Sequence, residues 1–345
     1  GRGDPHLLAR FYGRRALRIL PLYYGTLLVL LLVALVARHV EAASTSIEAF
    51  LRDQAWYWLH AANVAAARDT QWAAQSWVQH FWSLAVEEQF YLVWPAVVLL
   101  LPVRWLPRAI AATLVAALAL RIWLAVLAQL PVAAYVLTPS RADALAVGAL
   151  LAVAWRTPAW HTQLTRAAMV AVPVLGVALV ELVVTQGPNS GGLLMATVGH
   201  SYWALFFGAL LWLGVAPAVP HDDAPYAVVA GWKSWLGRQR WLHHVARYSY
   251  GLYVVHVPLR EWLASRRLVG TNLIAQHGEW VGGGAGIALG VLLSFAVAVP
   301  LWHLFEAPVL ARGGAWLDGS LRRRRTAAIP PAAVARPTPI EAATI

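Results

Sequence analysis

The chain has 345 residues, of which 60% are hydrophobic and only 12% are charged. This balance is far from that of soluble domains and indicates a membrane protein. The formal net charge of +11 could suggest nucleic-acid binding, but the Lys and Arg residues lie at the ends of apolar segments and in short loops. No nucleic-acid partner is therefore predicted. The absence of cysteine excludes disulfides and thiolate ligands, and no metal is expected.

The order of apolar segments predicts an all-α fold, a polytopic transmembrane helical bundle. About 20 apolar residues are needed to cross a bilayer as a helix, and this pattern recurs along the chain. The stretch 47–67 mixes aromatic and charged residues and is predicted to be an interfacial helix. We expect about eight spans, at residues 16–37, 76–101, 109–129, 141–155, 167–185, 193–216, 248–263 and 280–305.

The distribution of positive charge predicts the orientation of these spans. Nineteen of the 27 Lys and Arg residues fall on one side of the eight-span map, five on the other and three within spans. Since cytoplasmic loops carry the excess of positive charge, we expect both termini in the cytoplasm and the protein in the inner membrane, in contact with lipid. Residues 1–312 are expected to form the transmembrane domain, and the basic, Ala- and Pro-rich residues 313–345 a disordered cytoplasmic tail.

Polar side chains are concentrated in the segment Ser76–Pro95, which is otherwise apolar. Spaced at 100° per residue, four of them share one helical stripe: His80, Ser83, Glu87 and Tyr91. Glu88 is turned by roughly 80° from Glu87, so Glu87 is the better site candidate. Ionisable residues at membrane depth are costly and point to function, and a carboxylate near a histidine suits acid–base chemistry. The alternative is a buried polar network that only holds helices together.

This segment, HFWSLAVEEQFYLVWP, resembles the signature of the acyltransferase-3 family, membrane enzymes that O-acylate sugars and other hydroxyl-bearing acceptors. Four more segments resemble further blocks of the family, in the family's order: FYGRRALRILPLYY (11–24), RADALAVGALLA (141–152), YSYGLYVVHVPL (248–259) and LFEAP (304–308). The resemblance implies a membrane O-acyltransferase. It would transfer an acyl group from acyl-CoA to a hydroxyl of a carbohydrate or lipid-linked sugar at the cell surface. Acetyl is the first candidate for that acyl group.

Two arginines in the first block are the candidates for binding the donor. Arg15 and Arg18 are three residues apart and project from one helical face at the cytoplasmic end of the first span. The resemblance implies that they hold the phosphates of acetyl-CoA, which planar guanidinium groups suit. Positive-inside anchoring alone is the alternative.

The other blocks supply the remaining site candidates. With Glu87 and His80, the resemblance implies catalytic or positioning roles for Arg141 and His256. Asp143 could act in the site or, with Ser140, cap a helix. Glu306 could act in the site or be an interfacial carboxylate where a helix stops before proline. Two further ionisable residues in spans, Arg121 and Glu181, match no block and are given no role.

The family is built on about ten membrane helices, and its principal catalytic base is a histidine on the first of them. No such segment precedes the 11–24 block, and the chain opens like an internal loop. The sequence is therefore expected to be a fragment that lacks two helices and that histidine, and to be inactive alone. A transporter or flippase and a non-catalytic membrane scaffold remain as alternatives. The acceptor, the acyl group and the oligomeric state are not indicated by the sequence.

Overall fold

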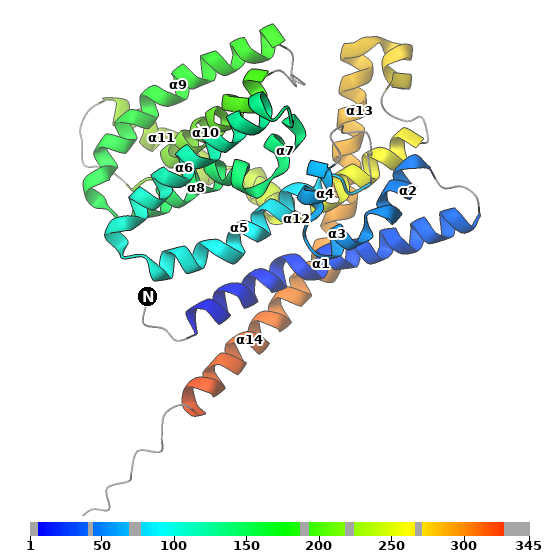
Figure 1. Ribbon diagram of the computed structural model, residues 1–345, viewed down its shortest axis with the longest axis horizontal. Coiled ribbons are helices and arrows are strands. Elements are labelled where there is room, and N and C mark those ends of the chain that lie inside the picture. The colour runs from blue at the N-terminus through cyan, green and yellow to red at the C-terminus, as the bar shows by residue number, and fades with distance from the viewer. Residues whose placement is uncertain are drawn as a thin grey trace, which may run out of the picture. The chain divides into compact units, whose positions relative to one another are not determined.

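The computed structural model describes residues 6–40, 44–68, 77–186, 193–217, 224–265 and 271–327. Every regular element in these residues is helical, which confirms the predicted all-α class (Figure 1). The α-helices are α1 (Leu7–His39), α2 (Thr45–Arg52), α3 (Gln54–Trp58), α4 (Ala62–Arg68), α5 (Phe81–Leu100), α6 (Leu106–Ile122), α7 (Pro131–Val136), α8 (Thr138–Trp155), α9 (His161–Gln186), α10 (His200–Val215), α11 (Ala224–Arg238), α12 (Arg240–Ser265), α13 (Thr271–Leu301) and α14 (Ala307–Ala327). Two 3₁₀ turns, η1 (Val103–Trp105) and η3 (Pro158–Trp160), and three π turns, η2 (Trp123–Leu127), η4 (Met195–Gly199) and η5 (Trp302–Glu306), join or extend them.

Among the described residues, seven helical segments are long and apolar enough to cross a membrane. They are Leu7–His39, Phe81–Leu100, Val103–Leu127, Pro131–Trp155, Pro158–Glu181, Met195–Val215 and Gly283–Leu321, and they confirm a multi-pass membrane protein. The predicted span 248–263 is not among them, because Arg260, Glu261 and several other polar residues lower the hydropathy of α12. An odd number of spans would place the two ends on opposite faces. The cytoplasmic location of both termini therefore stays a prediction that depends on α12.

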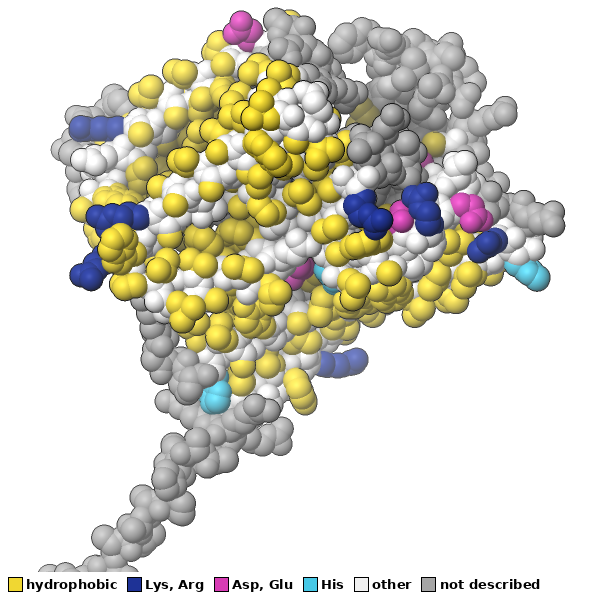
Figure 2. Space-filling view, in the orientation of Figure 1, with side chains coloured by type: hydrophobic (Ala, Val, Ile, Leu, Met, Phe, Trp, Pro, Cys, Tyr) yellow, Lys and Arg dark blue, Asp and Glu magenta, His cyan; other side chains and the backbone are white. Residues whose placement is uncertain are grey.

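The predicted interfacial stretch 47–67 forms three short helices, α2 to α4, none of them long enough to span a bilayer. The surfaces of the long helices, in contrast, carry large exposed apolar side chains, as lipid-facing positions require. Examples on α1 and α9 are Leu28, Val29, Leu32, Val174, Val177 and Val184. Figure 2 shows hydrophobic side chains over much of the visible face, with Lys and Arg gathered at a few places.

The chain divides into two compact units. Unit 1 comprises residues 1–23 and 300–345, and within it the first half of α1 packs against α14. Gly13 lies against Leu317 and Gly313 lies against Leu17, so the absence of a side chain at each glycine lets the helices approach closely. Arg14 and Asp318 add an exposed ion pair at 3.2 Å. Helix α14 continues through residues 313–327 of the expected tail, and residues 328–345 lie outside the described part of the chain.

Unit 2 comprises residues 24–299, and its helices α6, α8, α9 and α10 pack against one another (Figure 1). A buried cluster formed mainly by α8, α9, α10 and α11 contains Trp212, which is 1% exposed and donates a hydrogen bond from Nε1 to Thr165 Oγ1 at 3.1 Å. An indole buried in this way satisfies its only donor while it contributes a large apolar surface. The other buried members of the cluster are Ala154, Ala168, Leu213, Ala216 and Val229.

Gly208 of α10 packs directly against Val147 of α8. A Cβ atom at this position would lie 2.5 Å from Val147 Cγ1, and the branched valine has little rotamer freedom in a helix. Gly208→Ala is therefore expected to lower the free energy of unfolding by about 1–3 kcal/mol, the usual range for an overpacked core. Denaturant unfolding in detergent micelles measures the change. Gly214→Ala on the same helix, where a Cβ would meet nothing within 4 Å, is the matched control and should not destabilise the protein.

Candidate active site

The start of α5 and the middle of α12 bring together four polar side chains in unit 2. The Tyr253 hydroxyl donates to the backbone carbonyl of His80 at 2.5 Å, and its oxygen lies 2.5 Å from Ser83 Oγ. Because the tyrosine proton points to the carbonyl, the Ser83 hydroxyl is the donor in the second bond. The His80 ring packs against the rings of Tyr253 and His256, with centroids 5.1 and 4.8 Å away. Two histidines predicted from separate blocks are thus neighbours.

His80 is the most unusual member of this group. Both of its ring nitrogens are buried, and neither makes a hydrogen bond of ordinary geometry within the described part of the chain, although the backbone of Tyr253 and Val254 lies beside the ring. A buried polar atom without a partner costs free energy, so such atoms are rare and point to a bound molecule or to chemistry. His256 is different, because its side chain is exposed and its Nδ1 lies 2.7 Å from the Tyr253 carbonyl oxygen. That nitrogen must carry the proton.

Glu87 follows Ser83 by one turn of α5 and is half-buried. It lies within electrostatic range of Tyr253. Three residues of the predicted stripe therefore lie close together in the structure: His80, Ser83 and Glu87. Glu88 and Tyr91, the other candidates on this helix, are also half-buried.

Arg141, near the start of α8, lies in an aromatic environment. Its Cζ is 5.9 Å from the ring centroid of Trp82 and 5.4 Å from that of Tyr135, and the Tyr135 ring is 4.9 Å from His200. Rings at these distances stabilise a guanidinium through cation–π attraction. The Nη1 atom is buried and has no hydrogen-bond partner among the described residues. Tyr135 is also within electrostatic range of Tyr253, so the two parts form one polar cluster.

The structure decides against one of the two roles that the sequence suggested for Asp143. Helix α8 begins at Thr138, and no side chain caps it, so the capping alternative for Ser140 and Asp143 is wrong. Asp143 instead pairs with Arg121 of α6, whose Nη2 and Nη1 lie 2.7 and 3.2 Å from its two carboxylate oxygens. Arg121 and Asp143 are 0% and 1% exposed.

All five N–H donors of Arg121 are used. Besides Asp143, the guanidinium donates to the carbonyl oxygens of Thr197 and Ser140, at 2.6 Å each, and to the Ser201 hydroxyl. Ser201 in turn donates to Asp143 at 2.5 Å. A fully satisfied buried pair leaves nothing for a substrate, so Arg121 and Asp143 hold α6, α8 and α10 together. Opposite charges on separate apolar spans were the signal that could have predicted this pair.

A second network was also missed by the sequence analysis. Asn63 of α4 is 1% exposed and donates to Gln89 and Thr138 at 3.2 and 3.1 Å. Gln89 returns a bond to Asn63 at 2.9 Å and donates to the carbonyl oxygen of His60 at 3.0 Å. These bonds fix the short helices α3 and α4 to α5, close to the candidate site.

His60 gives the stability of unit 2 a pH dependence. Burial lowers the pKa of this histidine from its ordinary value of 6.5. Its contribution is therefore fully present above about pH 6.5 and is lost as the pH falls towards the folded-state pKa. The thermal midpoint is expected to fall between pH 7 and pH 5, and His60→Asn should flatten part of that fall. Asparagine tolerates the left-handed backbone at this position, where φ is 51°. An unchanged slope in His60→Asn would contradict the prediction.

The candidates for donor binding lie in unit 1. Arg15 is half-buried and Arg18 is exposed, one turn apart on α1. Arg18 is within electrostatic range of Glu306, which is buried in the π turn η5 with Oε1 lacking a hydrogen-bond partner among the described residues. The helix does not stop at this carboxylate, because α13, η5 and α14 continue without a break past Pro308. The alternative of a carboxylate at a helix stop is therefore wrong.

A buried, incompletely bonded polar cluster inside an apolar helical bundle is typical of a membrane protein that carries out chemistry. No group of three or more His, Asp or Glu residues suited to a metal ion is found in the described ranges. The sequence profile of the family Acyl_transf_3, described as an acyltransferase domain, matches residues 3–303. The chain therefore belongs to this family.

Two named relatives narrow the comparison. The O-acetyltransferase OatA of Staphylococcus aureus strain NCTC 8325 is 23% identical over 313 residues, which cover 89% of this chain and 48% of the relative. The peptidoglycan O-acetyltransferase OatA of Listeria monocytogenes strain EGD-e is 25% identical over 269 residues, 73% of this chain and 40% of the relative. The chain thus spans less than half the length of these relatives. No solved structure matches it significantly.

Proposed function

We propose that this chain transfers an acetyl group from acetyl-CoA to a hydroxyl of a cell-surface polysaccharide. The observation that carries the proposal is the pair of buried ring nitrogens on His80 that lack a partner, inside a polar cluster with Arg141. Membership of the acyltransferase family and the names of both relatives support acyl transfer to oxygen. The Listeria relative's printed substrate, peptidoglycan, supports a cell-wall glycan as acceptor.

In the proposed reaction the acceptor oxygen attacks the thioester carbonyl carbon. A carbon–oxygen bond forms, the carbon–sulfur bond breaks, and the hydroxyl proton leaves for a base while the CoA thiolate departs. An imidazole nitrogen can accept that proton, which is the role proposed for His80. This proposal replaces the expectation from the sequence that the base is missing from the chain and that the chain is inactive alone. The unpartnered Nη1 of Arg141 is suited to stabilise negative charge on the carbonyl oxygen, and Glu87 and His256 are assigned to positioning.

Arg15 and Arg18 are proposed to bind the phosphates of the donor, with Glu306 setting the orientation of Arg18. Planar guanidinium groups bind phosphate with two parallel hydrogen bonds, which a single lysine cannot do. The positive-inside rule supports a cytoplasmic location for this end of α1, where acetyl-CoA is available. The inner membrane is the proposed location of the protein.

The proposal is tested with membranes that contain the chain, acetyl-CoA labelled in the acetyl group and cell-wall glycan. Ester-bound label on the glycan is expected, and Arg15→Ala with Arg18→Ala should raise the KM for acetyl-CoA. Arg14→Ala is the matched control, because Arg14 is exposed on the same helix and pairs only weakly with Asp318. Passage of label across the membrane without ester formation would instead indicate a transporter. Absence of both would indicate a scaffold.

A further inference from the structure

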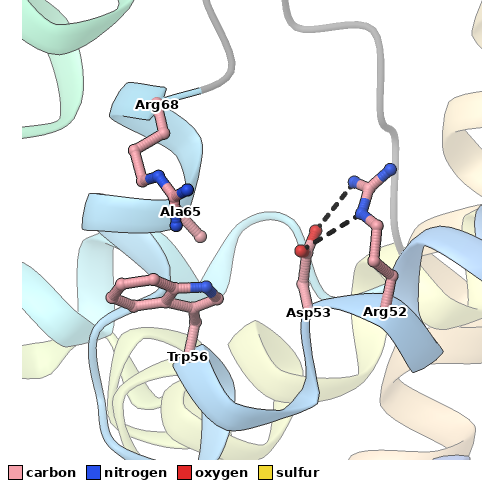
Figure 3. Close-up of a pocket in the computed structure, with 5 residues that line it drawn as sticks. All are labelled: Arg52, Asp53, Trp56, Ala65 and Arg68. Atoms are coloured by element: carbon pink, nitrogen blue, oxygen red, sulfur yellow. Dashed lines mark hydrogen bonds and ion pairs between the residues drawn. The ribbon is translucent and has the colours of Figure 1, made fainter.

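A pocket lies between the short helices α2 to α4, and none of the residues that line it belongs to the cluster around His80. Its volume is about 400 Å³, within the range of small-molecule sites, and Figure 3 shows its lining of Arg52, Asp53, Trp56, Ala65 and Arg68. It lies in the segment between the first two candidate spans, outside the membrane-crossing helices. If the start of α1 is cytoplasmic, this segment follows the opposite end of α1, on the outer face of the membrane.

The charged groups of this pocket are held in place by their neighbours. The Arg52 guanidinium donates to both carboxylate oxygens of Asp53, at 2.9 and 3.3 Å. Across the pocket the Arg68 guanidinium lies over the Trp56 ring, with Cζ 5.5 Å from the ring centroid (Figure 3). Stacking on an aromatic ring orients a guanidinium without using its N–H donors. Within the described residues Arg68 donates no hydrogen bond.

The balance of these groups indicates what they bind. Two guanidiniums face one carboxylate, so the pocket carries an excess positive charge, and the donors of Arg68 match a carboxylate or phosphate. Asp53 adds an acceptor, which recognises hydroxyl donors but repels a purely anionic ligand such as a lipid phosphate. The combination suits a ligand that carries both an anionic group and hydroxyls. A sugar with a carboxylate or phosphate has that composition.

We propose that this pocket binds an anionic sugar unit of the acceptor glycan, with the anionic group on Arg68 and sugar hydroxyls on Asp53. The inference rests on the proposed function in one respect, namely that the sugar belongs to the acceptor. Arg52 orients Asp53, and Trp56 orients Arg68. The pocket thereby holds the glycan outside the membrane spans and selects charged glycans over neutral ones.

Equilibrium binding tests the pocket without any acyl transfer. The full chain, in nanodiscs of zwitterionic lipid, is titrated with an oligosaccharide of alternating uronic acid and N-acetylhexosamine and with the same oligosaccharide after reduction of its carboxyl groups. The acidic form is expected to bind at least about tenfold more tightly, a difference of about 1.4 kcal/mol. A phosphorylated sugar in a separate titration distinguishes phosphate from carboxylate recognition.

Variants assign the preference to the pocket. Arg68→Ala should abolish the preference for the acidic oligosaccharide, whereas Arg68→Lys should keep part of it. Retention in Arg68→Lys would show that the loss in Arg68→Ala comes from the missing charge and not from misfolding. Arg38→Ala is the matched control and should keep the full preference. Arg38 is also exposed and lies in the last turn of α1, but it pairs with Glu48 at 3.6 Å, outside the pocket. A thermal unfolding scan of each variant confirms that it is folded.

Three results would overturn the inference: equal binding of both oligosaccharides, an unchanged preference in Arg68→Ala, or full competition by vesicles of anionic lipid, which would assign the pocket to lipid headgroups. The transfer assay separates this inference from the proposed function. Anion-selective binding that depends on Arg68, without acetyl transfer, would support the proposed sugar pocket and contradict the proposed transferase function. Acetyl transfer with an acceptor KM that Arg68→Ala does not change would support the proposed function and contradict the proposed role of the pocket in binding the acceptor.

Discussion

Arg121→Met is expected to lower the free energy of unfolding by about 3–5 kcal/mol, because it leaves the Asp143 carboxylate buried without its partner. The pair is almost completely inaccessible, and the loss also leaves the carbonyl oxygens of Thr197 and Ser140 without their donor. A buried acceptor that loses its donor keeps the full cost of desolvation. Reversible unfolding in mixed micelles, followed by tryptophan fluorescence, measures the difference.

The double variant Arg121→Met with Asp143→Leu separates charge from packing. Replacing both partners removes the uncompensated charge, so the double variant is expected to be more stable than Arg121→Met alone. Arg14→Ala is the exposed control, and breaking its pair with Asp318 should cost no more than about 1 kcal/mol. A loss of equal size in Arg14→Ala and Arg121→Met would contradict the idea that burial sets the magnitude.

His80→Asn is expected to lower kcat for acetyl transfer by about 10²–10⁴-fold, the usual contribution of a group that transfers a proton. Asparagine preserves one polar atom near Nδ1 but cannot accept the proton of an alcohol. The thermal midpoint should stay close to that of the parent or rise, because neither His80 nitrogen has a hydrogen bond to lose within the described structure. Initial rates at saturating acetyl-CoA measure the effect.

His161→Asn is the matched control for this experiment. Its Nε2 lies 3.1 and 3.2 Å from the carbonyl oxygens of Ala154 and Trp155, so the fold accounts for this histidine fully. It should change stability and leave kcat unchanged. A His80→Asn enzyme with at least a tenth of the parent's kcat would remove His80 from the chemistry.

The sequence was sufficient to predict the all-α fold class and most of the membrane spans. A lipid bilayer requires long apolar helices, and such helices are evident from the hydropathy of the sequence. The predicted span in α12 is not among the seven candidate segments, because Arg260 and Glu261 adjoin apolar residues, and it stays a prediction. The family blocks also placed His80, Ser83 and Arg141 among the candidates, and the structure brings these residues into one polar cluster. Their partners Tyr253 and Tyr135 were not singled out, since one tyrosine in an apolar helix does not show which neighbour its hydroxyl meets.

Arg121 shows why the remaining interactions were out of reach. Opposite charges on two spans could have suggested its pairing with Asp143, but its bonds to the two backbone carbonyls depend on tertiary structure, and no local spacing links these groups. The pairing of Asn63 with Gln89 and Thr138 is likewise tertiary, across 26 and 75 residues of sequence. Ser140 and Asp143 fitted a capping pattern, but the buried guanidinium of Arg121 was the stronger partner for the carboxylate.

The π turn η4 has a consequence for how this protein can vary among its relatives. A π turn contains one residue more than an α turn for about the same rise along the helix axis. Thr197, whose carbonyl receives the Arg121 guanidinium, lies in the middle of it, and Ser201 follows one turn later. The extra residue and the buried arginine are therefore linked structurally. Lineages that replace Arg121 are expected to have lost one residue from this turn, with the rest of α10 unshifted.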